Sequence, residues 1–124
     1  MTPLPLISEL RRAGETLTLA LDVTSELAPV EGHFPGTPIL PAVAQVDWAI
    51  RIARANFALP ARFSALRALK FLRVVQPPVK LMLELARLDD GHTVTFAFSH
   101  AGAACATGRI EFADDAARPD RSLL

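Results

Sequence analysis

The stretch "PAVAQVDWAIRIARANF", from Pro41 to Phe57, has the composition of one helix that is apolar over much of its circumference. Proline suits the first turn of a helix, where no N–H is needed, and the alanines and long side chains after it favour helix. A helix with so little polar surface must be largely covered by other elements. We therefore expect a helix that ends at about Asn56 and lies in the core.

Strand-like stretches stand on both sides of this helix. "ETLTLALDV", residues 15–23, alternates polar and apolar side chains, which predicts a first strand with one buried face. Four more stretches follow the helix, separated by turn residues at 76–78, 89–91 and 102: "FSALRALKFLRVV", "VKLMLELARLD", "HTVTFAFSHA" and "ACATGRIEFA". The pattern predicts an α+β fold in which one antiparallel sheet curls around one helix.

Length and composition narrow the class of protein. A chain of 124 residues, 51% of them hydrophobic, is expected to form one domain over residues 1–124, with a loose charged tail from about 114 to 124. No apolar run approaches the roughly 18–20 residues of a membrane span, so we expect no membrane partner. The first residues, MTPLPLISELRR, place arginine after the apolar residues, which is the wrong order for a secretory signal.

Cysteine and histidine usage indicates a reduced compartment and no metal. Cys105 is the single cysteine, so no intramolecular disulfide can form, which predicts a cytoplasmic location; we expect Cys105 itself to be a small core residue. His92 and His100 lie near turns without an acid at metal-ligand spacing, so both are expected on the surface.

A proline-rich segment precedes the helix and carries the candidate chemistry. Residues 34–41 cannot form regular helix or central strand, so they form a shaped loop that presents His33. Asp47 follows His33 by fourteen residues, inside the apolar helix. From periodicity alone, Asp47 is better explained by an exposed pair with Arg51 four residues later, worth about 0.3 kcal/mol. His33, taken alone, is better explained as an ordinary loop histidine that bonds to the backbone.

The stretch "HFPGTPILPAVAQVD" resembles the signature of the β-hydroxyacyl-acyl-carrier-protein dehydratases. That motif runs His-Phe-(Pro)-Gly-x-Pro-x-x-Pro-Gly and ends in an acid at the spacing of His33 and Asp47. The sequence "LPAVAQVDWAIR" is most similar to those of the small dehydratases of aryl-polyene and related polyketide-like clusters. With "LKFLRVVQPPVKL" and the strand order, the resemblance covers most of the chain. It implies a hotdog fold, a long helix wrapped by an antiparallel sheet, that usually works as a dimer.

The resemblance also implies a reaction and a site shared between subunits. The family removes water from β-hydroxyacyl thioesters on acyl carrier protein, giving trans-2-enoyl thioesters in fatty-acid or polyene biosynthesis. His33 of one subunit would abstract the α-proton, and Asp47 of the other would hold or protonate the β-hydroxyl. The backbone N–H of Ala42, which stands where the family has glycine, would polarise the thioester carbonyl. The residues expected to bind substrate are Phe34, Pro35, Gly36, Ile39, Leu40, Pro41, Val43 and Phe71.

Three features keep alternatives open. The Ala42 methyl can narrow the substrate slot, or the backbone there can require glycine. Phe71 is equally well explained as a plain core phenylalanine. Trp48 is expected to pack either in the core or in a dimer interface. The rival functions are a hotdog thioesterase, in which the helix carboxylate activates water, and a catalytically silent subunit that pairs with an active homologue.

The charge pattern suggests a partner. Seven basic residues lie between Arg51 and Lys80 with no acid among them: Arg51, Arg54, Arg62, Arg67, Lys70, Arg73 and Lys80. These residues either lie separately in solvent or create a positive electrostatic field that steers an acidic acyl carrier protein toward the chain. The phosphopantetheine arm of that carrier holds the substrate, so we expect the chain to need no cofactor of its own. Nucleic acid is disfavoured because exposed aromatics and a binding motif are lacking. The second subunit is either another copy or a different hotdog chain.

Overall fold

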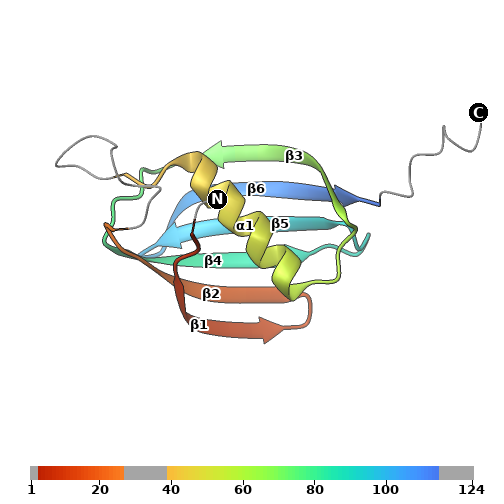
Figure 1. The fold of residues 1–124 in the computed structure, drawn as a ribbon, viewed down its shortest axis with the longest axis horizontal. Coiled ribbons are helices and arrows are strands. Elements are labelled where there is room, and N and C mark those ends of the chain that lie inside the picture. The colour runs from red at the N-terminus through yellow and green to blue at the C-terminus, as the bar shows by residue number, and fades with distance from the viewer. Residues whose placement is uncertain (1–2, 27–38, 115–124) are drawn as a thin grey trace, which may run out of the picture.

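A computed structural model describes residues 3–26 and 39–114. The elements are β1 (Leu6–Ala13), β2 (Thr16–Val23), α1 (Ala42–Asn56), β3 (Arg62–Phe71), β4 (Val79–Arg87), β5 (Thr93–His100) and β6 (Ala103–Ala113). Within this part of the chain the strands form one six-stranded sheet in the order β1-β2-β4-β5-β6-β3, every neighbouring pair antiparallel (Figure 1). Residues 115–124 of the predicted tail lie outside the described residues.

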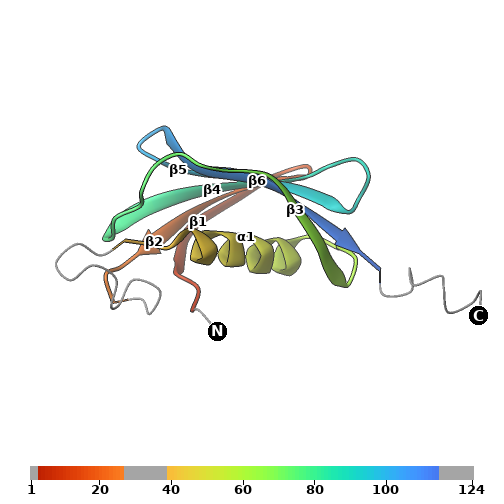
Figure 2. The same cartoon turned by 90° about the horizontal axis from the view of Figure 1, so that it is seen from above.

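The helix α1 lies obliquely across one face of the sheet, and the sheet curves around it (Figures 1 and 2). The expected α+β arrangement and the expected helix end at Asn56 are therefore confirmed. The amide of Phe57 bonds to the Ala53 carbonyl at 2.9 Å and closes the last turn. No helix in the described ranges is long and apolar enough to cross a membrane.

Two predictions about the strands were wrong. The strand at residues 15–23 is β2, and β1 precedes it as an edge strand. All side chains of β1 are exposed, so it lacks the alternation of buried and exposed residues that reveals a strand. Its charged residues Glu9, Arg11 and Arg12 suit an edge, where they discourage pairing with another chain. Strand β3 also ends at Phe71, and it pairs with β6 instead of its sequence neighbour β4.

The core forms between α1 and the sheet. Trp48 and Ala49 of the helix are fully buried, and they meet the inward side chains of β2 and β4, which include Leu19, Leu21 and Leu83. The Trp48 indole Nε1 donates to the carbonyl of Pro3 at 3.1 Å, which ties the start of the described chain to the helix. Trp48 is thus a core residue.

Cys105 is confirmed as a core residue. Its side chain belongs to the hydrophobic core with 2% exposure, and its thiol is free. Burial raises the pKa of Cys105, and the nearby Arg73 opposes this shift only in part. The thiol therefore stays protonated and unreactive at neutral pH.

Gly108 in β6 is required by close packing. It stands opposite Phe96 of β5, and a Cβ at this position would lie 2.6 Å from Phe96 Cε2 and 3.2 Å from Leu69 Cδ1. We expect Gly108→Ala to lower the free energy of unfolding by about 1–3 kcal/mol, measured by urea denaturation, because the ring must shift from its packed position. Phe96→Leu in the same background should restore part of the loss. An unchanged unfolding midpoint would contradict this packing.

Asp90 organises the turn between β4 and β5. Its Oδ1 accepts from the amides of His92 and Thr93, both at 2.9 Å, and its Oδ2 accepts from the Thr93 hydroxyl at 2.7 Å. The Thr93 hydroxyl bond, then the His92 amide bond, lower the pKa of Asp90 below its ordinary 3.8. A carboxylate with a lowered folded-state pKa stabilises the protein above its ordinary pKa, and the contribution disappears as pH falls through the folded pKa.

Asp90→Ala is therefore expected to lower the melting temperature by a few degrees at neutral pH, because three hydrogen bonds are lost. The difference in melting temperature between wild type and variant should become smaller as the pH falls below the ordinary aspartate pKa of 3.8. Melting curves across this pH range check both statements. A gap that stays constant with pH would show that the carboxylate charge has no part in the turn.

Candidate active site

An open pocket at the start of α1 collects most of the described residues that the sequence points to. Its volume is about 270 Å³, and its lining combines residues 39–42 with residues 71–75, which lie far apart in the sequence. The lining residues are Ile39, Leu40, Pro41, Ala42, Gln45, Phe71, Leu72, Arg73, Val74 and Val75. His33, Phe34, Pro35 and Gly36 lie outside the described residues.

Backbone hydrogen bonds hold the two walls of the pocket together. The amide of Leu40 donates to the Val75 carbonyl at 2.8 Å, in an isolated antiparallel bridge. The amides of Leu72 and Arg73 donate to the Cys105 carbonyl at 2.8 and 3.3 Å. These bonds attach the segment after β3 to both β6 and the residues before α1, so the pocket rests on the sheet.

The N-terminus of α1 opens onto this pocket without a cap. Pro41 is the N-cap residue, it makes no side-chain capping bond, and the first turn carries no acid. The Pro41 carbonyl accepts from the amides of Ala44 and Gln45 at 3.1 and 3.4 Å, while the N–H groups of Ala42 and Val43 precede the first intrahelical donors. Within the described residues no acceptor meets these two N–H groups, so the helix start presents the Ala42 N–H and a partial positive charge at the pocket.

Ala42 fits the backbone at the first helical position. It is exposed and helical, and among the described non-glycine residues only Ala68 and Ala101 have positive φ. The backbone here does not require glycine, and alanine leaves the N–H of this position in place.

Asp47 does not line this pocket. Its side chain is 41% exposed, and its Oδ2 accepts a hydrogen bond from Arg51 Nη1 at 3.2 Å. Val43, one turn earlier on the same stripe of the helix, is 75% exposed and is also outside the pocket lining. Within one chain, the helix thus turns Asp47 and Val43 away from the sheet, and the i,i+4 pair anticipated as an alternative is present.

Gln45 is a residue of the pocket that sequence reasoning missed. It is 3% exposed, and its Oε1 has no hydrogen-bond partner in the part of the chain that the structure describes. Its place among the buried helix residues was a usable signal, because it is the one polar side chain in that set: Ala44, Gln45, Trp48, Ala49, Ile52 and Ala53.

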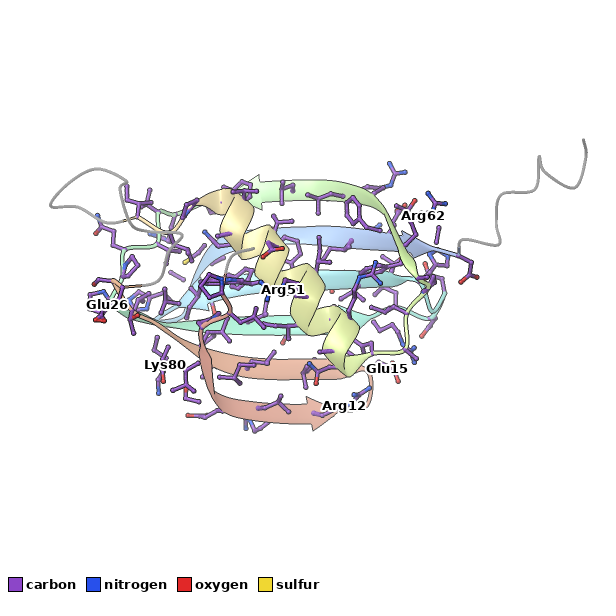
Figure 3. The ribbon with its side chains drawn as sticks, in the orientation of Figure 1. Arg12, Glu15, Glu26, Arg51, Arg62 and Lys80 are labelled. Carbon is purple, nitrogen blue, oxygen red and sulfur yellow. The ribbon has the colours of Figure 1, made fainter. Side chains whose placement is uncertain are left out.

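The basic segment does not gather on one surface. Figure 3 shows Arg51 near the middle of the helix, with Arg62 and Lys80 toward opposite ends of the molecule. Arg67 pairs with Glu111 at 2.8 Å, and the Arg54 guanidinium lies 4.9 Å from the centre of the Phe112 ring. Within the segment, only Arg73 lines the pocket at the start of α1.

The two histidines predicted on the surface are exposed. His92 lies 3.6 Å from the Asp90 carboxylate, and His100 Nδ1 is 3.3 Å from the Lys80 carbonyl. A pocket of about 400 Å³ beside His100, Arg73 and Cys105 is larger than the one at the helix start. It contains none of the residues predicted to react or to bind substrate, so we place the candidate site at the helix.

One helix laid on a curved six-stranded antiparallel sheet, with a pocket at the uncapped helix start, defines a chain of the hotdog class. A family model described as ApeI dehydratase matches residues 9–109. The chain belongs to the ApeI-like dehydratase family, which confirms the narrower resemblance seen in the sequence. No protein of curated function matches it significantly.

Solved structures agree with this assignment. The dehydratase heterocomplex ApeI:P from Xenorhabdus doucetiae matches with 29% identity and a TM-score of 0.79, over 86% of this chain and 96% of that chain. An uncharacterized protein from Erwinia carotovora subsp. atroseptica matches with 25% identity and a TM-score of 0.71, over 94% and 98% of the two chains. An inactive mutant of the CurK dehydratase, at 14% identity and a TM-score of 0.60, covers 97% of this chain and 46% of that chain, and shares the fold alone.

Proposed function

We propose that this chain dehydrates β-hydroxyacyl thioesters carried on acyl carrier protein, giving trans-2-enoyl thioesters in a polyene-type pathway. The observation that carries the proposal is the uncapped start of α1, which opens onto a largely apolar pocket between Ala42 and Phe71. Membership of the ApeI-like dehydratase family supports this reaction over thioester hydrolysis. The single Cys105 leaves no intramolecular disulfide, which favours a cytoplasmic location.

The proposed reaction assigns one role to each group. The acyl chain lies along the pocket, with the thioester carbonyl oxygen accepting from the Ala42 N–H as negative charge develops on it. His33 takes the α-proton, Asp47 holds the β-hydroxyl or, in its protonated form, gives it a proton, the hydroxyl leaves as water, and a carbon–carbon double bond forms between the α and β carbons. Because Asp47 faces away from the sheet within one chain, it would serve a site completed by another subunit.

The surface around β3 supports such a second subunit. Strand β3 is an edge of the sheet, and large apolar side chains on it and just after it are exposed: Phe63, Leu69, Phe71, Leu72 and Val74. Exposed apolar residues that cluster at the unpaired outer edge of a strand are typical of an interface. We propose that a second hotdog chain covers this edge, either another copy or a different chain, as the heterocomplex from Xenorhabdus doucetiae suggests.

Arg73 is the proposed contact for the carrier. It lines the pocket and lies at the exposed surface after β3, where it can meet an acidic carrier protein or the phosphate of its arm. The remaining arginines and lysines of the basic segment are dispersed over the molecule, so we propose no larger docking surface.

Conversion of a β-hydroxyacyl carrier-protein thioester, followed by intact-mass spectrometry, tests the function. The substrate should lose the mass of one water molecule, and the enoyl form should gain it in the reverse direction. The assay is run on the purified chain and on the chain co-expressed with a hotdog protein that copurifies with it. A protein inert in both forms, with substrate that a known dehydratase converts, would favour the silent subunit.

A further inference from the structure

The buried amide of Gln45 is the unexplained polar group of the pocket. Its side chain is 3% exposed, and Oε1 has no partner among residues 3–26 and 39–114. A buried carbonyl oxygen without a hydrogen bond destabilises a folded protein compared with an apolar side chain of the same size. Gln45 therefore weakens the fold in this state, which points to a partner that arrives with a ligand.

The rest of the pocket tells which kind of partner is needed. Among the described lining residues, Gln45 and Arg73 are the two polar side chains, and Arg73 can only donate hydrogen bonds. Gln45 Oε1 is consequently the one side-chain acceptor in that lining. Oε1 is enclosed in this state, and a half-turn about the last side-chain bond exchanges it with the amide nitrogen and presents the oxygen to the pocket, because a glutamine amide has an acceptor and donors at the same end. Its partner must be a group that donates a hydrogen.

The position of Gln45 on α1 indicates which group of the substrate it meets. Gln45 follows Ala42 by three residues, so the two lie on the same side of the helix, about 4.5 Å apart along its axis. Ala42 is exposed at the pocket mouth and Gln45 is buried. If the thioester carbonyl binds at the Ala42 N–H, the acyl chain leads inward, and the first hydrogen donor along it is the β-hydroxyl.

We propose that the Gln45 amide binds the β-hydroxyl of the substrate and distinguishes hydroxyacyl chains from saturated and unsaturated ones. This inference rests on the proposed function. The hydroxyl donates to Gln45 Oε1, which leaves its oxygen lone pairs free for protonation. The water that departs can still donate to Oε1, whereas the enoyl product cannot, so loss of water removes a hydrogen bond from the bound acyl chain and favours release.

The test measures ligand preference instead of turnover. The purified chain, alone and together with a hotdog protein that copurifies with it, is titrated calorimetrically with two pantetheine amides of equal chain length, one 3-hydroxyacyl and one saturated, which replace the reactive thioester. We expect wild type to bind the hydroxyacyl ligand about 3- to 10-fold more tightly, the usual range for one neutral hydrogen bond. Gln45→Met should bind the two ligands about equally well. Its melting temperature should equal or exceed that of wild type, because an unpaired buried oxygen is removed.

Controls separate this inference from the proposed function. Ala55→Met changes an exposed position of the same helix and should keep the wild-type preference. Gln45→Leu is a second apolar variant in case Gln45→Met does not fold. Wild type that binds neither ligand would overturn both proposals. Wild type that binds both ligands equally, or a Gln45 variant that keeps the preference, would overturn this inference alone.

Discussion

Replacement of His33 by alanine, or of Asp47 by asparagine, is expected to slow dehydration about 100-fold or more while the protein stays folded. Each variant removes a group that moves a proton in the transition state, and such groups typically contribute 10²- to 10⁴-fold. The rate is followed by intact mass on the carrier-linked substrate, and folding by thermal melting. Glu84→Gln, a change of an exposed carboxylate in β4, serves as control and should keep the wild-type rate.

The alternative role of Asp47 makes a different prediction. If its contact with Arg51 at 3.2 Å is its whole function, Asp47→Asn should cost only about 0.3–0.5 kcal/mol of stability and leave the rate unchanged. That outcome would contradict the proposed site.

A mixture can then show where the site lies. Co-expression of the His33→Ala and Asp47→Asn chains should recover measurable activity if two copies share each site, because a mixed dimer contains one intact pair. No recovery, with both single variants inactive, would contradict a site shared by two copies, and would leave a site within one chain or a site completed by a different hotdog chain.

Trp48→Ala is expected to lower the free energy of unfolding by about 3–5 kcal/mol, the range for large aromatic side chains removed from a core. Trp48 is fully buried between α1 and the sheet, so its removal leaves a cavity that the surrounding strands cannot close. Urea denaturation measures the change. A loss smaller than about 1.5 kcal/mol would mean that the helix is packed less firmly than the structure indicates.

Trp48→Phe separates packing from hydrogen bonding. Phenylalanine keeps most of the apolar contact but loses the bond from the indole to the Pro3 carbonyl, at 3.1 Å in the wild type, so about 0.5–1.5 kcal/mol is expected from that bond. Val43→Ala is the matched control on the same helix, because a side chain that is 75% exposed should change stability by less than about 0.5 kcal/mol.

The contrast between Trp48 and Gln45 distinguishes two kinds of buried helix residue. Trp48 has its polar atom paired and stabilises the fold, whereas Gln45 Oε1 has no partner within the described chain. Both positions follow from the same apolar stripe in the sequence. Hydrophobic periodicity predicts burial, but it does not predict whether a polar atom finds a partner, since that depends on what lies opposite.

The edge strands show where sequence patterns are weakest. Strand β2 was predicted because one of its faces is buried, and its alternation is plain. Strand β1 was missed because it is exposed throughout. Strand β3 was predicted, but its pairing with β6, which begins more than thirty residues later, was not. Edge strands carry little periodic signal, and strand order depends on contacts that no local stretch contains.

By itself, the sequence determined the helix from residue 42 to 56, the turns at Asp90 and Gly102, the alternation of β2 and the family motif. These features depend on proline, glycine and side-chain period acting within a few residues. The tertiary structure decided that Phe71 joins Ile39 at one pocket, that Gln45 Oε1 has no described partner, and that Asp47 turns away from the sheet. Those facts arise when residues distant in sequence are packed together, because burial and pairing depend on the neighbours that folding supplies.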